Sequence, residues 1–141
     1  MSETSDLEAL VQVVDRIDPG TLTAKDVDEI QAWGADNVGF ILVDMDTQKI
    51  LFATQGAEKI FGYMQDEMVG MDLIQLVPNE FAAVHPKYVE GFNAHPAPRS
   101  MGKRDATLFG KERDGATFPV EIGLFPRKFK SRRVCLANVV R

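Results

Sequence analysis

Residues 110–126, GKERDGATFPVEIGLFP, decide the fold of this chain. The dipeptide Asp114-Gly115 separates two strand-like runs, and Asp-Gly in this setting is the strongest short-range signal of a β-hairpin. After the turn, every second residue from Phe118 to Leu124 is large and apolar, which is typical of a strand with one buried face. The predicted strands of the C-terminal third are 104–113, 116–127 and 132–141.

The segment before this hairpin predicts a second hairpin and a set of short helices. Two apolar runs, the predicted strands 38–44 and 49–53, flank the turn-like DMDTQK (44–49). Residues 55–78 contain short helical pieces, because glycines and a proline interrupt them repeatedly. Residues 94–103, AHPAPRSMGK, are predicted to form a loop.

The order of these segments predicts an α+β fold, a five-stranded antiparallel sheet with short helices on one face. Helices between a sheet and solvent can enclose a cavity, where small molecules usually bind. The chain also has nine phenylalanines, whose side chains can fill such a cavity. The sequence does not distinguish an open cavity from a filled one.

The stretch EFAAVHPKYVEGF (80–92) predicts a helix, since apolar residues from Phe81 to Phe92 recur three or four positions apart. His85 interrupts this apolar face and is followed by Pro86. One interpretation is a metal ligand that points into a pocket. The other is a structural histidine at the start of a helix, because proline fits the first helical turn.

The first 36 residues differ in charge from the rest of the chain. Residues 1–36 have a net charge of −7, whereas residues 37–141 have a net charge of +2. Two amphipathic helices are predicted in this part, at about 5–17 and from Thr23 to about Trp33. Short helices of this kind must pack on the domain or on another chain. We therefore expect an N-terminal helical cap over 1–36 and a separate domain over 37–141.

Residues 37–141 resemble a PAS domain. The resemblance rests on the first hairpin GFILVDMDTQKILFAT (39–54), on the AEKIFGY and DEMVG motifs of the connecting helices, and on RDGATFPVEI (113–122) in the central hairpin. It covers about three-quarters of the chain, in order and without gaps. This resemblance implies a sensory or interaction module that signals through an output domain, such as a histidine kinase, a diguanylate cyclase or phosphodiesterase, or a transcription regulator.

The resemblance also implies how such a module assembles. Many PAS domains form dimers, so we expect a homodimer through residues 5–33 and the sheet face. The sequence ends at Arg141, where the family's linker to the output domain would begin. The chain is therefore expected either to be the sensor part of a longer protein or to act on its output in trans.

The resemblance leaves three possibilities for the ligand: an unidentified ligand or none, haem b, or flavin. PAS domains that bind haem use a histidine on the long helix as proximal ligand, and His85 matches this position with Tyr88 following it. On the distal side, the arginine of oxygen-sensing relatives is replaced by Ala106, which leaves Arg104 and Met101 as candidates. A light-driven flavin–thiol adduct is excluded, because the one cysteine, Cys135, lies in the last strand and is expected to be a small buried residue.

Several other classes of function lack sequence support. No phosphate-binding glycine loop, nucleophile motif or metal-ligand spacing is present, so we expect no catalytic activity in this chain. The basic run RKFKSRR (127–133) has no nucleic-acid-binding motif around it and is expected to be a solvated hairpin loop. No apolar run is long enough to span a membrane, and no signal peptide is recognisable. The expected location is the cytoplasm.

Overall fold

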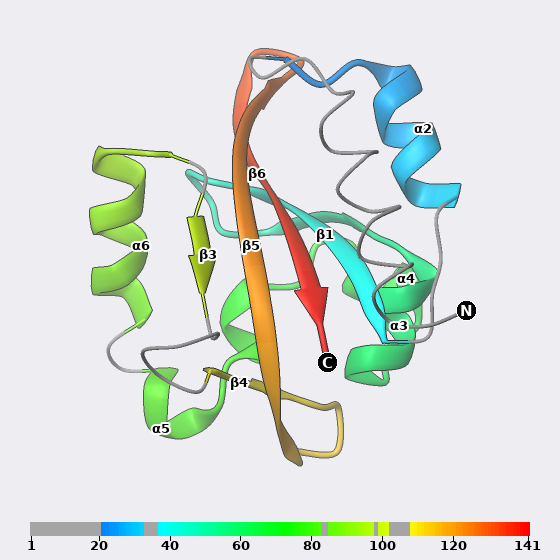
Figure 1. Cartoon of the computed structure of the whole chain (residues 1–141), viewed down its shortest axis with the longest axis vertical. Coiled ribbons are helices and arrows are strands. Elements are labelled where there is room, and N and C mark those ends of the chain that lie inside the picture. Colours follow the sequence, from blue (N-terminus) through cyan, green and yellow to red (C-terminus); the bar gives the residue numbers. More distant parts are fainter. Residues whose placement is uncertain (1–20, 33–36, 83–84, 98, 102–107) are drawn as a thin grey trace.

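The computed structural model describes residues 21–32, 37–82, 85–97, 99–101 and 108–141 (Figure 1). Its elements are α2 Ala24–Ala32, β1 Val38–Asp44, β2 Ile50–Ala53, α3 Gln55–Phe61, α4 Gln65–Met68, the 3₁₀ helix η1 Leu73–Leu76, α5 Asn79–Ala82, α6 His85–Ala94, β3 Arg99–Met101, β4 Leu108–Lys111, β5 Thr117–Phe129 and β6 Arg132–Val140. None of the described helices is long and apolar enough to cross a membrane.

The strands form an antiparallel sheet in the order β2-β1-β6-β5-β3, and β4 pairs with β5 outside this path. This confirms the predicted α+β fold and its two hairpins. The prediction of a loop throughout 94–103 was wrong, because β3 lies within it and Met101 pairs with Ile122 of β5. A long strand such as β5 can form backbone hydrogen bonds with a neighbouring strand on each of its two edges. The prolines of residues 94–103 precede β3 and therefore do not interrupt its pairing with β5.

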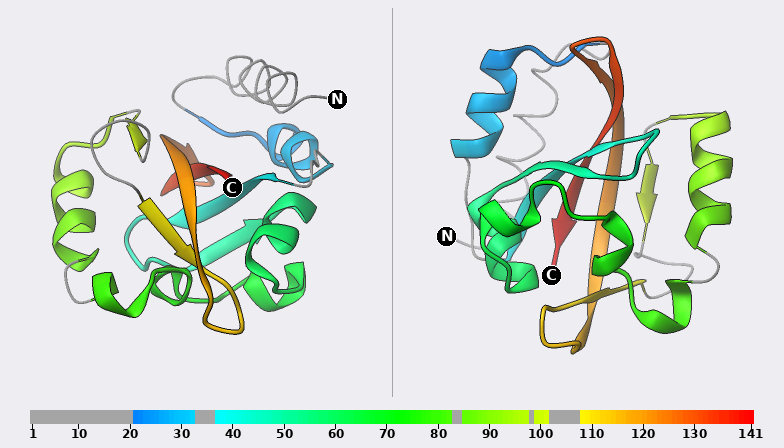
Figure 2. Two further views of the ribbon diagram at one scale, coloured as in Figure 1. Left: turned by 60° about the horizontal axis from the view of Figure 1, so that its bottom comes forward. Right: turned by 180° about the vertical axis from the view of Figure 1, so that it is seen from behind.

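Two hydrophobic clusters lie on the two faces of the sheet. All seven residues of β1 are buried, and alternate residues point to opposite faces. Phe40 and Leu42 belong to the cluster that includes Leu22 and Ile30 of the N-terminal part. Helices α3 and α4 and the 3₁₀ helix cover the other cluster. Figure 2 shows α2 and α3 on opposite sides of the sheet, so α2 packs on the domain itself.

Helix α2 confirms the predicted start at Thr23. The backbone N–H of Asp26 donates to Thr23 Oγ1, and the N–H of Thr23 donates to Asp26 Oδ2. These reciprocal bonds satisfy two backbone donors that a helix start leaves free. The N–H of Leu22 donates to the Lys128 carbonyl at 2.7 Å, which ties the start of α2 to β5. The predicted helix 5–17 and the end near Trp33 lie outside the described residues.

The predicted helix over 80–92 is broken into α5 and α6, and α6 begins at His85. The physical reason is Pro86, which has no N–H and whose ring collides with the carbonyl of the residue four positions earlier. That residue is Ala82, where α5 ends. Proline is well tolerated in the first turn of a helix, and this is its place in α6. His85 therefore lies at a helix start rather than in the middle of an apolar face.

Candidate functional site

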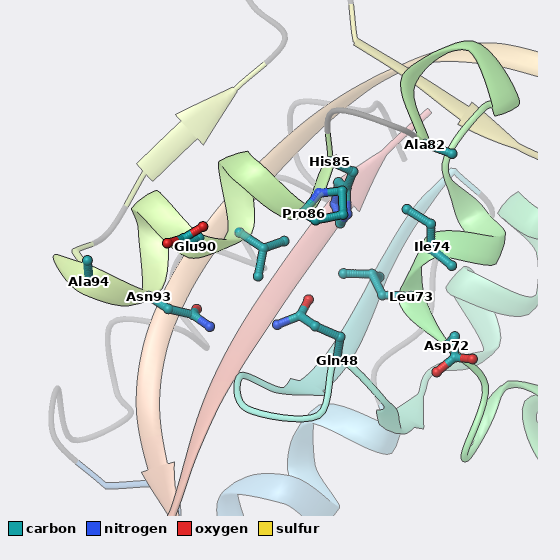
Figure 3. Close-up of a pocket in the computed structure, with 11 residues that line it drawn as sticks. Gln48, Asp72, Leu73, Ile74, Ala82, His85, Pro86, Glu90, Asn93 and Ala94 are labelled. Atoms are coloured by element: carbon teal, nitrogen blue, oxygen red, sulfur yellow. The ribbon is translucent and has the colours of Figure 1, made fainter.

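A pocket of about 650 Å³ lies between α6, η1 and the connection between β1 and β2 (Figure 3). Its described lining combines apolar side chains with five polar or charged ones, and such a combination is usual for small-molecule sites. The lining residues are Gln48, Asp72, Leu73, Ile74, Ala82, His85, Pro86, Val89, Glu90, Asn93 and Ala94.

Helix α6 contributes to the pocket with one face. Its lining residues form two neighbouring rows, and within each row the residues are four positions apart in the sequence. One row runs through His85, Val89 and Asn93, and the other starts at Pro86. Residues at this spacing lie above one another on a helix. The opposite wall comes from Leu73 and Ile74 of η1. In Figures 1 and 2, α6 stands beside β3, away from α2 and α3.

The imidazole of His85 is half-buried at the start of α6. Burial lowers the pKa of His85, because removing water penalises the charged ring. The ring is therefore neutral at pH 7 and keeps one nitrogen lone pair, which can accept a hydrogen bond or bind a metal. No described residue forms a hydrogen bond with this ring.

Two side-chain amides meet at a single backbone carbonyl. Gln48 Nε2 and Asn93 Nδ2 donate to the Met45 oxygen at 2.8 and 2.7 Å. The backbone of Gln48 has a positive φ of 61°, and its carbonyl accepts the N–H of Leu73 at 3.0 Å. Sequence reasoning missed both amides as site residues. The sequence offered the place of Gln48 in the turn-like DMDTQK stretch, which indicates a turn rather than a ligand contact.

The charged residues in the described lining of the pocket are acidic. Asp72 and Glu90 are acidic members of the lining, and no lysine or arginine belongs to its described part. Lys49 lies near the rim but forms an ion pair with Asp72 at 2.7 Å. Arg133 donates to the Asn93 carbonyl at 3.3 Å and is paired with Asp46 at 2.6 Å. Both of these described cations are thus already paired with a carboxylate.

Of the four predicted site residues, His85 is the one whose side chain lies in the described part of the structure, and it lines the pocket. Tyr88 belongs to α6 and Met101 ends β3, but their side chains are not among those the structure describes. Arg104 lies outside the described residues. The roles assigned to these three residues therefore stay predictions.

The described lining matches haem b only in part. A neutral histidine beside Leu73, Ile74 and Val89 suits a proximal iron ligand in an apolar pocket. Haem b also carries two carboxylates, and the described lining offers them acids rather than bases. The described residues therefore fit the iron of haem b but not its two carboxylates.

The remaining chemistry-bearing groups do not form a second centre. Cys135 is partly buried in β6, where the sequence predicted a small buried residue, and burial raises the pKa of its thiol to about 12. The thiol stays protonated at neutral pH, so it is a poor nucleophile. Within the described part of the chain, no group of three or more His, Cys, Asp or Glu residues is placed to hold a metal ion.

Comparisons with known proteins agree with this architecture. The model of the PAS fold family matches residues 36–137. The sensor protein FixL of Bradyrhizobium diazoefficiens is 31% identical over 74 residues, which are 52% of this chain and 14% of FixL. The oxygen sensor protein DosP of Escherichia coli is 29% identical over 52 residues, which are 37% of this chain and 6% of DosP. The chain thus spans only a small part of these relatives.

A solved structure extends the likeness over more of the chain. The PAS domain of an HTR-like protein from Haloarcula marismortui superposes with a TM-score of 0.61 at 18% sequence identity. The match covers 82% of this chain and 93% of that domain. At this identity the likeness concerns the fold alone.

Proposed function

The chain belongs to the PAS family, and from this premise we propose that it is a non-catalytic sensory and interaction module. It dimerises and relays a ligand- or partner-dependent signal to an output domain, in the same protein or in trans. The output is of the histidine kinase, diguanylate cyclase or phosphodiesterase, or transcription regulator type. Sensor proteins among the relatives support this proposal, and PAS domains in such proteins commonly dimerise and link to output domains. We assign the protein to the cytoplasm on the same basis.

The observation that carries the proposal is the continuous set of contacts between the pocket and the N-terminal part. Asn93 lines the pocket, and its carbonyl accepts a hydrogen bond from Arg133. Arg133 of β6 pairs directly with Lys128 of β5. The Lys128 carbonyl in turn accepts the N–H of Leu22, just before α2. A change at the pocket therefore has a contiguous structural route to the predicted dimer contact.

A relay of this kind requires two conformations that the ligand or partner binds unequally. We place the two conformations at α6 and the β5–β6 hairpin, because the contact set starts at Asn93 of α6 and passes through Arg133 and Lys128 of the hairpin. In this proposal, residues 5–33 and the sheet face form the homodimer contact. Exposed Lys25 and Asp28 on α2 leave polar surface for a second chain beside the apolar residues that face the sheet.

Sedimentation of the whole chain and of a version lacking residues 1–20 tests this proposal. We expect the whole chain to dimerise and the shortened chain to shift toward monomer, because part of the contact is removed. Circular dichroism of the shortened chain is the control for intact folding. A whole chain that stays monomeric at all concentrations tested, or a folded shortened chain that dimerises equally well, would contradict the assigned contact.

The alternative is a haem-based gas or redox sensor with His85 as proximal ligand. One observation favours it, namely the neutral, half-buried imidazole at the pocket. The test is an absorption spectrum of protein expressed with a haem precursor, compared with His85→Ala. A Soret band that is lost in the variant would establish this alternative. A colourless protein that does not take up added haemin would rule it out.

A further inference from the structure

The geometry points to the chemical class of ligand that the pocket takes. We propose that the pocket beside α6 binds a small neutral or cationic molecule with an apolar body and an O–H or N–H donor at one end, and that it discriminates against carboxylates. This inference rests on the proposed sensory function, since it names the ligand class for the same pocket.

The apolar body is accommodated between two walls. Leu73 and Ile74 of η1 form one wall, and Pro86 of α6 lies across from them (Figure 3). Val89 of α6 also lines the pocket. Removing apolar ligand surface from water is favourable and adds to the affinity in proportion to the area covered. A volume of about 650 Å³ has room for a body the size of a two-ring aromatic. Contact between the apolar ligand body and these side chains adds to the affinity but does not distinguish a charged ligand from a neutral one.

The donor end of the ligand is recognised by two amide oxygens. The nitrogens of Gln48 and Asn93 are both directed at the Met45 carbonyl. Figure 3 shows the two amide nitrogens turned toward each other and the two oxygens on the side of His85 and Glu90. No described residue donates to either oxygen. Two acceptors at one end of an apolar pocket match a hydroxyl or ammonium group of a ligand.

The charge distribution sets the preference against anions. Asp72 and Glu90 belong to the lining, while the nearby cations Lys49 and Arg133 are held in ion pairs. A carboxylate that enters this pocket loses water and meets no unpaired lysine or arginine in the described lining, which is costly. An ammonium group meets the two amide oxygens and Glu90. The pocket therefore favours a cation or a neutral donor over an anion.

A matched series of compounds on one naphthalene body tests the proposal with the whole chain. The series contains 1-naphthaleneethanol, 2-(1-naphthyl)ethylamine, 1-naphthylacetate and the methyl ether of the alcohol. Backbone amide NMR shifts of α6, η1 and residues 45–48 report binding. We expect the alcohol and the amine to bind at least about tenfold more tightly than the acid. The ether keeps the oxygen but lacks the donor, so it should bind about tenfold more weakly than the alcohol.

Glu90→Lys should reverse part of this preference, because it adds a cation at the rim: the acid should gain affinity several-fold and the amine should lose it. Glu80→Lys is the matched control, since Glu80 is exposed on α5 and does not line the pocket. The proposal is overturned if the acid binds as tightly as the alcohol and the amine, if the ether binds as tightly as the alcohol, or if no compound shifts these amides. Tight binding of the acid would leave the sensory function intact, whereas loss of the dimer is a separate outcome seen by sedimentation.

Discussion

The contact between α3 and β1 and the contact between α6 and the pocket are built in opposite ways. At the first, an added Cβ on Gly39 would lie 2.3 Å from the Ala57 nitrogen, so helix and strand backbones nearly touch. Thr54 is fully buried there, and its Oγ1 accepts the N–H of Phe40 at 3.0 Å. On α6, exposed Gly91 lies outside the pocket lining, and an added Cβ there would meet no described atom within 4 Å.

This difference separates the part that specifies the fold from the part that can respond. A close-packed contact with paired polar groups has one low-energy arrangement. None of the described side chains of α6 is fully buried, and Asn93 near its end is held by hydrogen bonds to Met45 and Arg133, so we expect this helix to move at lower cost. We therefore expect substitutions in the first region to change stability and substitutions in the second to change binding.

The largest effect is expected for Gly39→Ala. The new methyl group would overlap the backbone of α3, which cannot shift as a flexible side chain can. We expect a loss of about 3 kcal/mol or more in the free energy of unfolding, or failure to fold. Urea denaturation followed by circular dichroism measures it.

Gly91→Ala is the matched control in the other region. Alanine is favoured over glycine in a helix, and the added methyl group meets open space. This variant should gain about 0.5–1 kcal/mol of stability. Equal losses in the two variants would show that α6 is as tightly packed as α3 and would remove the contrast between the regions.

An intermediate effect is expected for Asp44→Asn at the end of β1. Asp44 is buried, and Oδ1 accepts the N–H groups of Asp46 and Thr47 at 2.8 and 3.0 Å. Burial alone would raise the pKa of Asp44, but these bonds and the charge of Arg132 outweigh it and lower the pKa below its ordinary value of 3.8. The carboxylate therefore adds stability above pH 3.8, and this stability is lost as the pH falls through the lowered folded-state pKa.

Replacing this carboxylate by an amide should cost about 1–2 kcal/mol at pH 7, because hydrogen bonds to a charged acceptor become bonds to a neutral one. The cost should shrink as the pH falls through the titration range of the wild-type carboxylate. Unfolding free energies of both proteins from pH 7 to acid measure this. Asp66→Asn, an exposed change on α4, should have little effect at pH 7. A constant difference between Asp44→Asn and wild type at every pH would argue against the carboxylate as the cause.

Local patterns in the sequence predicted most of the fold. The Asp-Gly hairpin, the alternation around Phe118 and the Thr23 capping box all depend on neighbouring residues, and each is present in the structure. Two details depend on residues far apart. The pairing of β3 requires the free edge of β5, and periodicity alone did not show that Pro86 ends the preceding helix at Ala82.

The site was less predictable than the fold for a similar reason. His85 stood out because a histidine within an apolar pattern is unusual, and it does line the pocket. Gln48 and Asn93 lie 45 positions apart, and only the folded chain directs both amides at the Met45 carbonyl. Neither residue belongs to a motif, so local patterns carried no sign of their convergence.

The smallest effect on stability is expected for His85→Gln, although this residue lies in the candidate functional site. Burial holds the pKa of His85 below its ordinary value of 6.5. As the pH falls below 6.5, the unfolded chain takes up a proton before the folded chain does, so wild-type stability decreases. Because the ring is only half-buried, we expect this decrease to be less than about 1 kcal/mol. His85→Gln should abolish it and leave the stability at pH 8 nearly unchanged.

Urea denaturation between pH 8 and pH 5 measures this effect, with His95→Gln as control because His95 is exposed after α6. A larger loss for His85→Gln at pH 8, of about 3 kcal/mol, would mean that the imidazole is a fixed part of the core. The start of α6 would then resemble the contact between α3 and β1. A small loss of unfolding free energy together with altered binding of 1-naphthaleneethanol would instead place His85 in the responsive region. In that region, a side chain can contact the ligand although it contributes little to stability.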